Sequence, residues 1–276
     1  MTEGWLGAPL PAAQDEPVEF DTSVAHIARV YDYWLGGKDN FAADRAAGDE
    51  ALQAYPDLVS SVRANRAFLA RGVNYLAEVG IRQFLDIGTG IPSANNTHEV
   101  AQRVAPGSRV VYVDNDPIVL AHARALLVGS PEGATDYLDA DLRDTAKILE
   151  HAAGVLDFAQ PVAVMLVAVL HLIGPEDDPY GIVRQLMSAV PPGSHLLLSH
   201  VASDIEPEKM AEMGKRLNRQ LAQRGWYRSQ PEVAGLFAGL ELAAPGLVPV
   251  QHWRPDSEMD AARRSAMWGG VARKPS

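Results

Sequence analysis

Between residues 83 and 199, short apolar segments alternate with segments of helical periodicity. The segment 162–167 is apolar throughout, which is typical of a strand buried on both faces. Strands that alternate with helices form βαβ units, and right-handed crossovers join these units into a doubly wound parallel sheet. We expect strands at 83–87, 109–113, 135–138, 162–167 and 195–199.

The C-terminal part of the chain adds two strand candidates: 240–243 together with 247–251, and 267–272. The segments 247–251 and 267–272 are too close in sequence for a crossover helix, so we expect them to pair antiparallel. The predicted fold class is therefore α/β, with a doubly wound, Rossmann-like sheet of seven mostly parallel strands and an N-terminal helical cap.

The chain divides into three parts by composition and periodicity. Residues 1–19 are rich in Pro, Ala and Gly and are expected to form a flexible tail. Residues 20–60 carry helical patterns and predict a cap. Residues 61–276 predict the α/β domain, with the polar helical segment 205–225 lying over the sheet.

Composition excludes several classes of protein. The formal net charge of −11 argues against a general nucleic-acid binder, because phosphate contacts need clustered cations. The chain has no cysteine, which excludes disulfides, thiolate nucleophiles and zinc–thiolate sites. The longest apolar stretch, 161–174, is too short to span a bilayer, which takes about 20 residues. We expect a cytoplasmic protein with no membrane partner; its oligomeric state stays open.

Glycines and acids gather at the ends of the first three expected strands. The first strand runs into Gly88-Thr89-Gly90, and a Gly turn there lets backbone approach a ligand closely. The second strand ends in Asp114, where an acid can accept both hydroxyls of a ribose. Asp141 follows the third strand. Solvated loop acids explain each position singly, but a nucleoside site explains all three together.

The residues around the Gly turn favour one nucleoside ligand over another. A nicotinamide-binding turn has a third Gly where this chain has Ser93, and Asp86 would repel a pyrophosphate. Asp86 would suit an ammonium group instead. S-adenosylmethionine carries an ammonium, a ribose diol and an adenine amino group, which match the three acidic positions. A nicotinamide-dependent oxidoreductase is the less favoured alternative.

These residues resemble the successive motifs of class I S-adenosylmethionine-dependent methyltransferases. The chain also resembles an actinobacterial methyltransferase-like family, whose members mostly lack an assigned substrate, over roughly residues 20–275. The superfamily motifs are Asp86-Ile87-Gly88-Thr89-Gly90, Val113-Asp114-Asn115-Asp116 and Ala140-Asp141-Leu142, with the turn and strand at 189–198; the family segments are 28–41, 63–69 and 83–86.

The resemblance implies a role for each cofactor-binding position. It implies that the loop Gly88, Thr89 and Gly90 faces the methionine moiety and that the stretch from Ala168 to His171 lines the methyl-transfer side. It also implies that the N-terminal helices lie over the pocket. On the nucleoside, it implies that Asp114 holds the ribose hydroxyls, that Asn115 flanks the adenine, and that Asp141 accepts from the adenine amino group with the Leu142 amide nearby.

The carboxylate of the methionine moiety needs a cation that the acidic loop around Asp86 does not offer. Arg66 is our first choice, because its planar guanidinium can grip a carboxylate with two hydrogen bonds and its helix leads to the Gly turn. Lys38, in the loop after Gly36-Gly37, is the second. Pairing of the arginines with surface acids is the alternative.

The remaining candidates concern catalysis and the substrate. His171 is either a general base or a side chain packed against the cofactor. No two histidines have the spacing of a shared metal site, so we predict no metal. Tyr31 and Tyr33 form either an aromatic lid or core, and Trp253 is a candidate wall of the substrate cavity.

Taken together, the sequence predicts an S-adenosylmethionine-dependent methyltransferase acting on an unidentified small molecule. A non-catalytic S-adenosylmethionine-binding protein would present the same cofactor site and stays open as the alternative. The sequence identifies neither the acceptor atom nor the role of Asn95 and Asn96.

Overall fold

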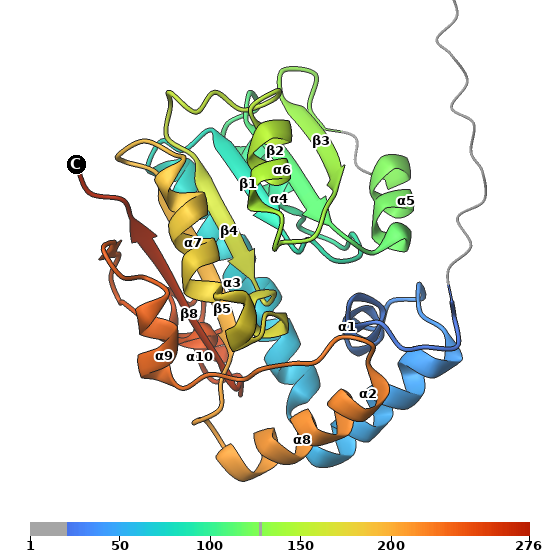
Figure 1. Cartoon of the computed structure of the whole chain (residues 1–276). Helices are drawn as coiled ribbons and strands as arrows, with labels where there is room; N and C mark the ends of the chain where they lie inside the picture. The colour runs from blue at the N-terminus through green and yellow to red at the C-terminus, as the bar shows by residue number, and fades with distance from the viewer. Residues whose placement is uncertain (1–20, 127–128) are drawn as a thin grey trace, which may run out of the picture.

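The computed structural model of the chain describes residues 21–126 and 129–276 (Figure 1). The expected tail at 1–19 lies outside the described residues, and so does the expected end of the helix that follows Asp116.

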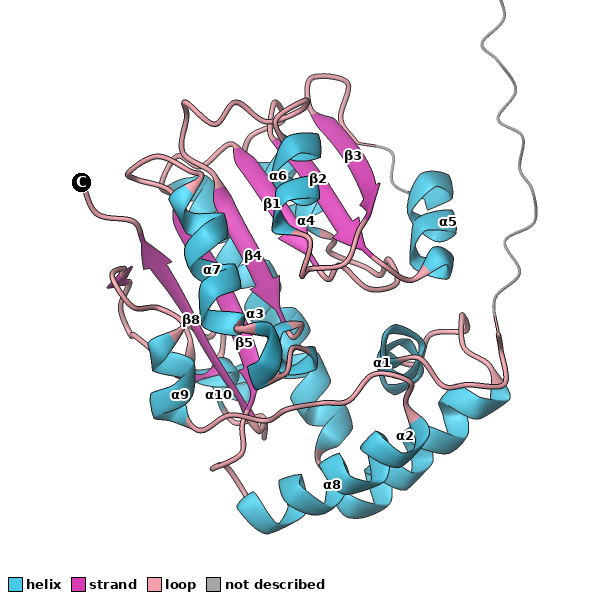
Figure 2. Ribbon diagram, in the orientation of Figure 1, coloured by secondary structure: helices cyan, strands magenta, loops and turns pink. Residues whose placement is uncertain are grey.

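Within the described residues, one sheet of eight strands forms the centre of the molecule, in the order β3-β2-β1-β4-β5-β8-β6 with β7 also on β8. The strands from β3 to β5 are parallel, and β8 runs antiparallel to β5 (Figure 2). The mostly parallel α/β sheet predicted from the sequence is confirmed. The strands are β1 (Gln83–Ile87), β2 (Arg109–Asp114), β3 (Ala134–Asp139), β4 (Ala163–Val167), β5 (His195–Val201), β6 (Glu241–Leu242), β7 (Val248–Pro249) and β8 (Met267–Arg273).

The described sheet has eight strands where the sequence predicted seven. The difference arises because two short strands, β6 and β7, both pair with β8. β6 pairs antiparallel with the end of β8, at Ala272 and Arg273. β7 pairs antiparallel with the start of β8, at Trp268 and Gly269. Both short strands therefore share one edge of β8, and the antiparallel pairing expected between 247–251 and 267–272 is confirmed.

Helices cover both faces of the sheet. Phe84 packs with α3 and α4 on one face, and its neighbour Leu85 packs with α6 and α7 on the other, because successive strand residues point to opposite faces. The α-helices are α1 (Ile27–Leu35), α2 (Ala42–Ala54), α3 (Leu58–Glu78), α4 (Thr97–Val104), α5 (Pro117–Leu126), α6 (Thr145–Ala152), α7 (Pro179–Ser188), α8 (Pro207–Gln220), α9 (Gln230–Gly235) and α10 (Glu258–Ala261). The 3-10 helices are η1 (Leu170–Leu172), η2 (Pro175–Asp177) and η3 (Val250–His252).

A cap made of α1, α2 and α8 lies beyond the carboxyl ends of the parallel strands (Figure 1). The sequence expected 205–225 to lie over the sheet, but α8 packs against α2 instead (Figure 2). The reason is the apolar face of α8, where Met210, Met213 and Leu217 recur at steps of three and four and join the core of the cap. Helix α3 belongs to both parts, since Val62 packs in the cap and Val73 packs on the sheet.

Candidate active site

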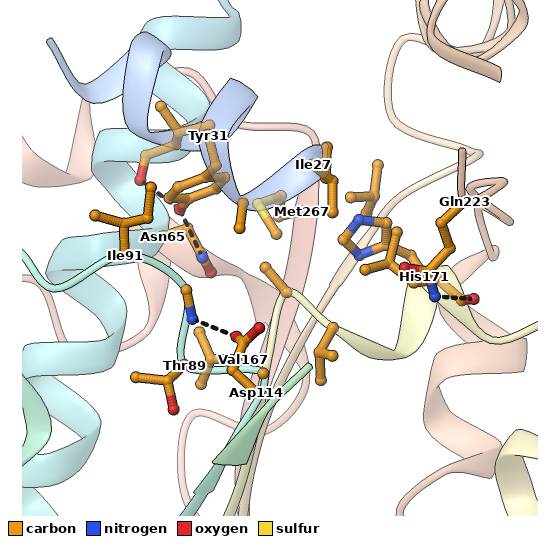
Figure 3. Close-up of a pocket in the computed structure, with 18 of the residues that line it drawn as sticks. Ile27, Tyr31, Asn65, Thr89, Ile91, Asp114, Val167, His171, Gln223 and Met267 are labelled. Carbon is orange, nitrogen blue, oxygen red and sulfur yellow. Dashed lines mark hydrogen bonds between the residues drawn. The ribbon is translucent and has the colours of Figure 1, made fainter. Parts of the chain in front are cut away.

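A cavity of about 1510 Å³, counting its opening to solvent, lies at the carboxyl ends of β1, β2 and β4. Ile27 and Tyr31 of α1 point into it from the cap, while Thr89 and Asp114 line it from the sheet (Figure 3). His171 lies on another side of the same space. A crevice at this edge of a parallel sheet is where doubly wound folds bind ligands.

The Gly turn has a backbone conformation that favours glycine at two positions. Gly88 and Gly90 have φ angles of 76° and 67°, in the left-handed region that favours glycine. A Cβ on Gly88 would lie 2.4 Å from Cγ2 of Val169, so the turn packs tightly against the β4 loop. A Cβ on Gly90 would meet nothing within 4 Å, because this position faces the open cavity. The turn therefore leaves room for a ligand beside Gly90.

Asp114 lines the cavity at the end of β2. Its Oδ2 accepts a hydrogen bond from the Gly90 amide at 2.8 Å, and its Oδ1 accepts from the Asp116 amide at 3.0 Å. Burial raises the pKa of this carboxyl, against the lowering effect of the two amides. A carboxylate has about four acceptor positions, so Asp114 retains capacity for two ligand hydroxyls.

Asp86 is buried at the cavity floor, with 4% of its surface exposed. The Thr97 hydroxyl donates to its Oδ2 at 2.6 Å. Burial raises the pKa of Asp86 to about 6, and the nearby positive charge of Arg66 opposes that rise. An ionised Asp86 lacks a close cationic partner among the described residues, which is a favourable setting for the ammonium of a ligand.

Asp141, Asn115 and Leu142 line the cavity beyond Asp114. Asn115 donates to Oδ2 of Asp141 at 3.3 Å. Arg143, which the sequence analysis did not single out, holds the same carboxylate through a 3.0 Å ion pair. Asp141 and Arg143 are two residues apart in a loop, and no sequence pattern there predicts their ion pair. Part of the acceptor capacity of Asp141 is therefore already engaged.

The two cations predicted to hold a carboxylate lie in different places. Arg66 lines the cavity, and its Nη2 donates to the carbonyl oxygens of Ala94 and Asn95 at 3.2 and 3.4 Å. Lys38 is exposed in the loop after α1 and is not among the lining residues, so the structure does not bring it to the cavity. The structure thus keeps Arg66 as the candidate cation.

Asn95 and Asn96 have structural roles in the loop between the Gly turn and α4. Asn95 has a φ of 62°, and Asn adopts this conformation more easily than most residues. Asn96 caps α4: its Oδ1 accepts from the Ser93 amide and its own amide donates to Glu99. Both residues shape the loop that holds Arg66.

Ala168 and His171 follow β4 and line the cavity. Ala168 has a φ of 54°, and its amide donates to both the carbonyl and the hydroxyl of Ser199. His171 is buried on η1, and burial lowers its pKa to about 4. Its Nδ1 has no hydrogen-bond partner among the described residues. A neutral imidazole with an unused nitrogen therefore borders the cavity.

The aromatic candidates for the substrate site separate into one lining residue and two that lie elsewhere. Tyr31 lines the cavity, and its hydroxyl donates to the Val62 carbonyl. Tyr33 is not a lining residue; its hydroxyl donates to Asp49 at 2.7 Å. Trp253 is fully buried. The expectation that Trp253 forms a wall of the cavity is wrong. Its ring packs against the rings of Phe68 and Tyr75, with centroids 5.6 and 5.7 Å away.

Asn65 is a lining residue that sequence reasoning passed over. It is 1% exposed; its Nδ2 donates to the Tyr31 hydroxyl at 3.0 Å, and its Oδ1 accepts from the Ser199 hydroxyl at 2.6 Å. Ser199 lies in β5, and its hydroxyl also accepts from the Ala168 amide, so these contacts join the cap helix α1 to the loop after β4. The sequence did contain a signal for Asn65, because a polar residue on the apolar face of a helix often has a specific role.

Comparison with known proteins places the chain in a family. A family model described as S-adenosyl methyltransferase matches residues 13–275. A DUF574 family protein of Streptomyces avermitilis is 46% identical, with a TM-score of 0.89 over 92% of this chain and 99% of the other. A candidate methyltransferase of Thermobifida fusca is 42% identical, with a TM-score of 0.85 over 93% of this chain and 97% of the other.

The plantazolicin methyltransferase BpumL, whose structure contains a triazolic desmethylPZN analogue and SAH, shares the fold. The identity is 10% and the TM-score is 0.51, over 90% of this chain and 96% of the other. A comparison with curated proteins found no match. The family model, the fold and the two relatives above 40% identity agree. The chain belongs to the S-adenosyl methyltransferase family, whose methyl donor is S-adenosylmethionine.

Proposed function

We propose that this methyltransferase acts on a small molecule that binds beneath the cap. The observation that carries the proposal is the position of α1, whose Ile27 and Tyr31 reach into the cavity from above (Figure 3). The start of α3 and the helix α8 add further lining residues. A site covered by helices suits a compact acceptor better than a protein or nucleic-acid chain.

The lining residues fit S-adenosylmethionine, which when bound supplies an activated methyl group. The open space at Gly90 admits the methionine moiety beside the turn Gly88-Thr89-Gly90. Asp86 is assigned to the ammonium, since a buried carboxyl with a raised pKa gains from a cationic partner. Asp114 is assigned to the ribose hydroxyls through its remaining lone pairs.

The adenine is assigned to the residues after β3. Asp141 would accept from the adenine amino group, with the Leu142 amide nearby and Asn115 flanking the ring. Arg143 already holds Asp141, so it fixes the carboxylate in place and takes up part of its acceptor capacity. Ala168 and His171 are assigned to the methyl-transfer side.

The partners and location are part of the same proposal. The net charge of −11 supports a protein without a nucleic-acid partner. The lack of cysteine is compatible with a cytoplasmic location. Among the helices that the structure describes, none is both long and apolar enough to cross a bilayer.

The test is incubation of the protein with methyl-labelled S-adenosylmethionine and a cell extract separated by size. We expect label in the small-molecule fraction and formation of the homocysteine product, with a heat-treated sample as control. Label transferred only to protein or nucleic acid would contradict the small-molecule proposal.

Arg66 gives a prediction about the methionine carboxylate. Arg66→Met should weaken S-adenosylmethionine binding about tenfold to a hundredfold, because a charge-assisted, two-pronged contact is lost. Binding of 5′-deoxy-5′-methylthioadenosine should change much less, since this ligand lacks the amino-acid tail. Calorimetry measures both affinities.

Arg63→Met is the matched control, because Arg63 lies one turn earlier on α3 and is exposed. It should leave both affinities unchanged. Equal losses for both ligands in Arg66→Met would indicate a folding defect, and no loss for either would remove Arg66 from the site.

A further inference from the structure

The cap side of the cavity carries a group of apolar side chains. Six of the apolar lining side chains from α1, the start of α3 and α8 are called the cap wall: Ile27, Leu58, Val62, Met210, Met213 and Leu217. None of the lining residues from α8 or from the first turns of α3, through Val62, is charged. Most charged lining groups lie elsewhere, at the carboxyl ends of β1, β2 and β3 and at Arg66. Asp32 of α1 also lines the cavity, but its Oδ2 already accepts hydrogen bonds from the Asp39 amide and the Asn40 side chain.

The cap wall restricts the charge of whatever binds against it. Moving an ionised group from water to an apolar surface raises its free energy strongly when no partner of opposite charge is present. Methionine thioethers also make favourable contacts with aromatic rings, and Met267 adds a third methionine to Met210 and Met213. An uncharged molecule with an aromatic ring is the ligand that this surface favours.

His171 is a polar lining residue beside Tyr227, whose ring packs against the core of the cap; the two ring centroids are 6.4 Å apart. Its Nδ1 is buried without a partner in the described chain, and buried polar atoms ordinarily have one. Its ring lies edge-on to His200, with centroids 6.0 Å apart. Arg228 donates to Nε2 of His200 at 2.8 Å, which places a fixed positive charge behind both rings. Burial and this charge lower the pKa of His171 to about 4, so its imidazole is neutral and has a nitrogen lone pair that can accept a hydrogen bond.

We propose that the methyl acceptor is an uncharged aromatic molecule bearing a hydroxyl, whose ring lies on the cap wall and whose hydroxyl hydrogen-bonds to His171. In the transfer, the hydroxyl gives its proton to the imidazole and its oxygen bonds to the methyl carbon. The sulfur keeps the electron pair of the broken carbon–sulfur bond. A hydroxyl needs such a base because it is a weak nucleophile when protonated, whereas a neutral amine does not.

This inference rests on the proposed function and is tested by binding with three ring-matched probes. The probes are 2-naphthol, 2-naphthoate and (2-naphthyl)methylammonium, each titrated into the wild-type protein saturated with S-adenosylhomocysteine. We expect 2-naphthol to bind at least tenfold more tightly than either charged probe. Equal binding of a charged probe, or no binding of any probe at millimolar concentration, would overturn the inference.

The role of His171 is tested by comparing 2-naphthol with naphthalene, which lacks the hydroxyl. In His171→Phe, 2-naphthol affinity should fall about five- to tenfold, to that of naphthalene, and naphthalene affinity should stay within about twofold. An unchanged preference for the hydroxyl would exclude His171 as its partner. His171→Gln is the second variant if His171→Phe loses S-adenosylhomocysteine binding.

Binding of S-adenosylhomocysteine separates failure of this inference from failure of the proposed function. If the wild-type protein does not bind S-adenosylhomocysteine, the proposed function fails whatever the probes do. If it binds S-adenosylhomocysteine and the probes show no discrimination, only the acceptor class is wrong.

Discussion

Asp114→Ala is expected to weaken S-adenosylmethionine binding by about 1.5–3 kcal/mol, the size of a charge-assisted hydrogen bond. The carboxylate is held by the amides of Gly90 and Asp116 and has lone pairs left for the ribose hydroxyls. The substitution removes those acceptors and also the contact that ties β2 to the Gly turn. Isothermal titration with S-adenosylmethionine measures the loss.

Asp139→Ala is the matched control for Asp114→Ala. Asp139 is exposed at the end of the neighbouring strand β3 and does not line the cavity. Its removal should leave the affinity unchanged, while thermal unfolding checks that both variants are folded. Equal affinity of wild type and Asp114→Ala would contradict the assignment of the ribose to this residue.

Asp86 should make S-adenosylmethionine binding depend on pH. Its pKa of about 6 means that the carboxyl is mostly protonated at pH 5 and mostly ionised at pH 7. If the ammonium binds the ionised form, affinity should rise about tenfold between pH 5 and pH 7, in proportion to the ionised fraction. Asp86→Asn should bind more weakly and show a flat profile. A wild-type affinity that is equally flat would remove Asp86 from the ammonium site.

The same carboxyl should lower the stability of the ligand-free protein at high pH. A carboxyl with a folded-state pKa near 6 and an ordinary value of 3.8 binds its proton more tightly in the folded state, so the free energy of unfolding falls as pH rises through this window. Asp86→Asn removes this penalty and should be more stable than wild type at pH 8 by up to about 3 kcal/mol. Urea unfolding should show that the difference in unfolding free energy between Asp86→Asn and wild type vanishes near pH 4. If Asp86→Asn is no more stable than wild type at pH 8, Asp86 does not carry a buried, destabilising charge.

The parts of the site that are local in sequence could be predicted from it. The end of β1, the Gly turn and Asp114 follow from an apolar run, two glycines and an acid within one βαβ unit. The topology then brings the ends of β1 and β2 together, because parallel neighbours end at the same edge of a sheet. The split of the sheet position beside β8 was not predictable, since pairing of two-residue strands depends on their partner.

The parts that depend on distant packing could not be predicted. Trp253 is followed by Arg254 and has no periodicity that reveals its burial against α3. The apolar face of α8 indicates that the helix packs on something, yet only the fold shows that the partner is α2. The position of Lys38 likewise depends on how the loop after Gly36 leaves the cap.

The most direct measurement is a crystal structure of the protein with S-adenosylhomocysteine. The account predicts one molecule in the cavity, with its ribose hydroxyls within hydrogen-bond distance of Asp114, its ammonium near Asp86 and its sulfur facing the side of Ala168 and His171. Binding at a different place on the chain, or a ribose that contacts neither oxygen of Asp114, would contradict it.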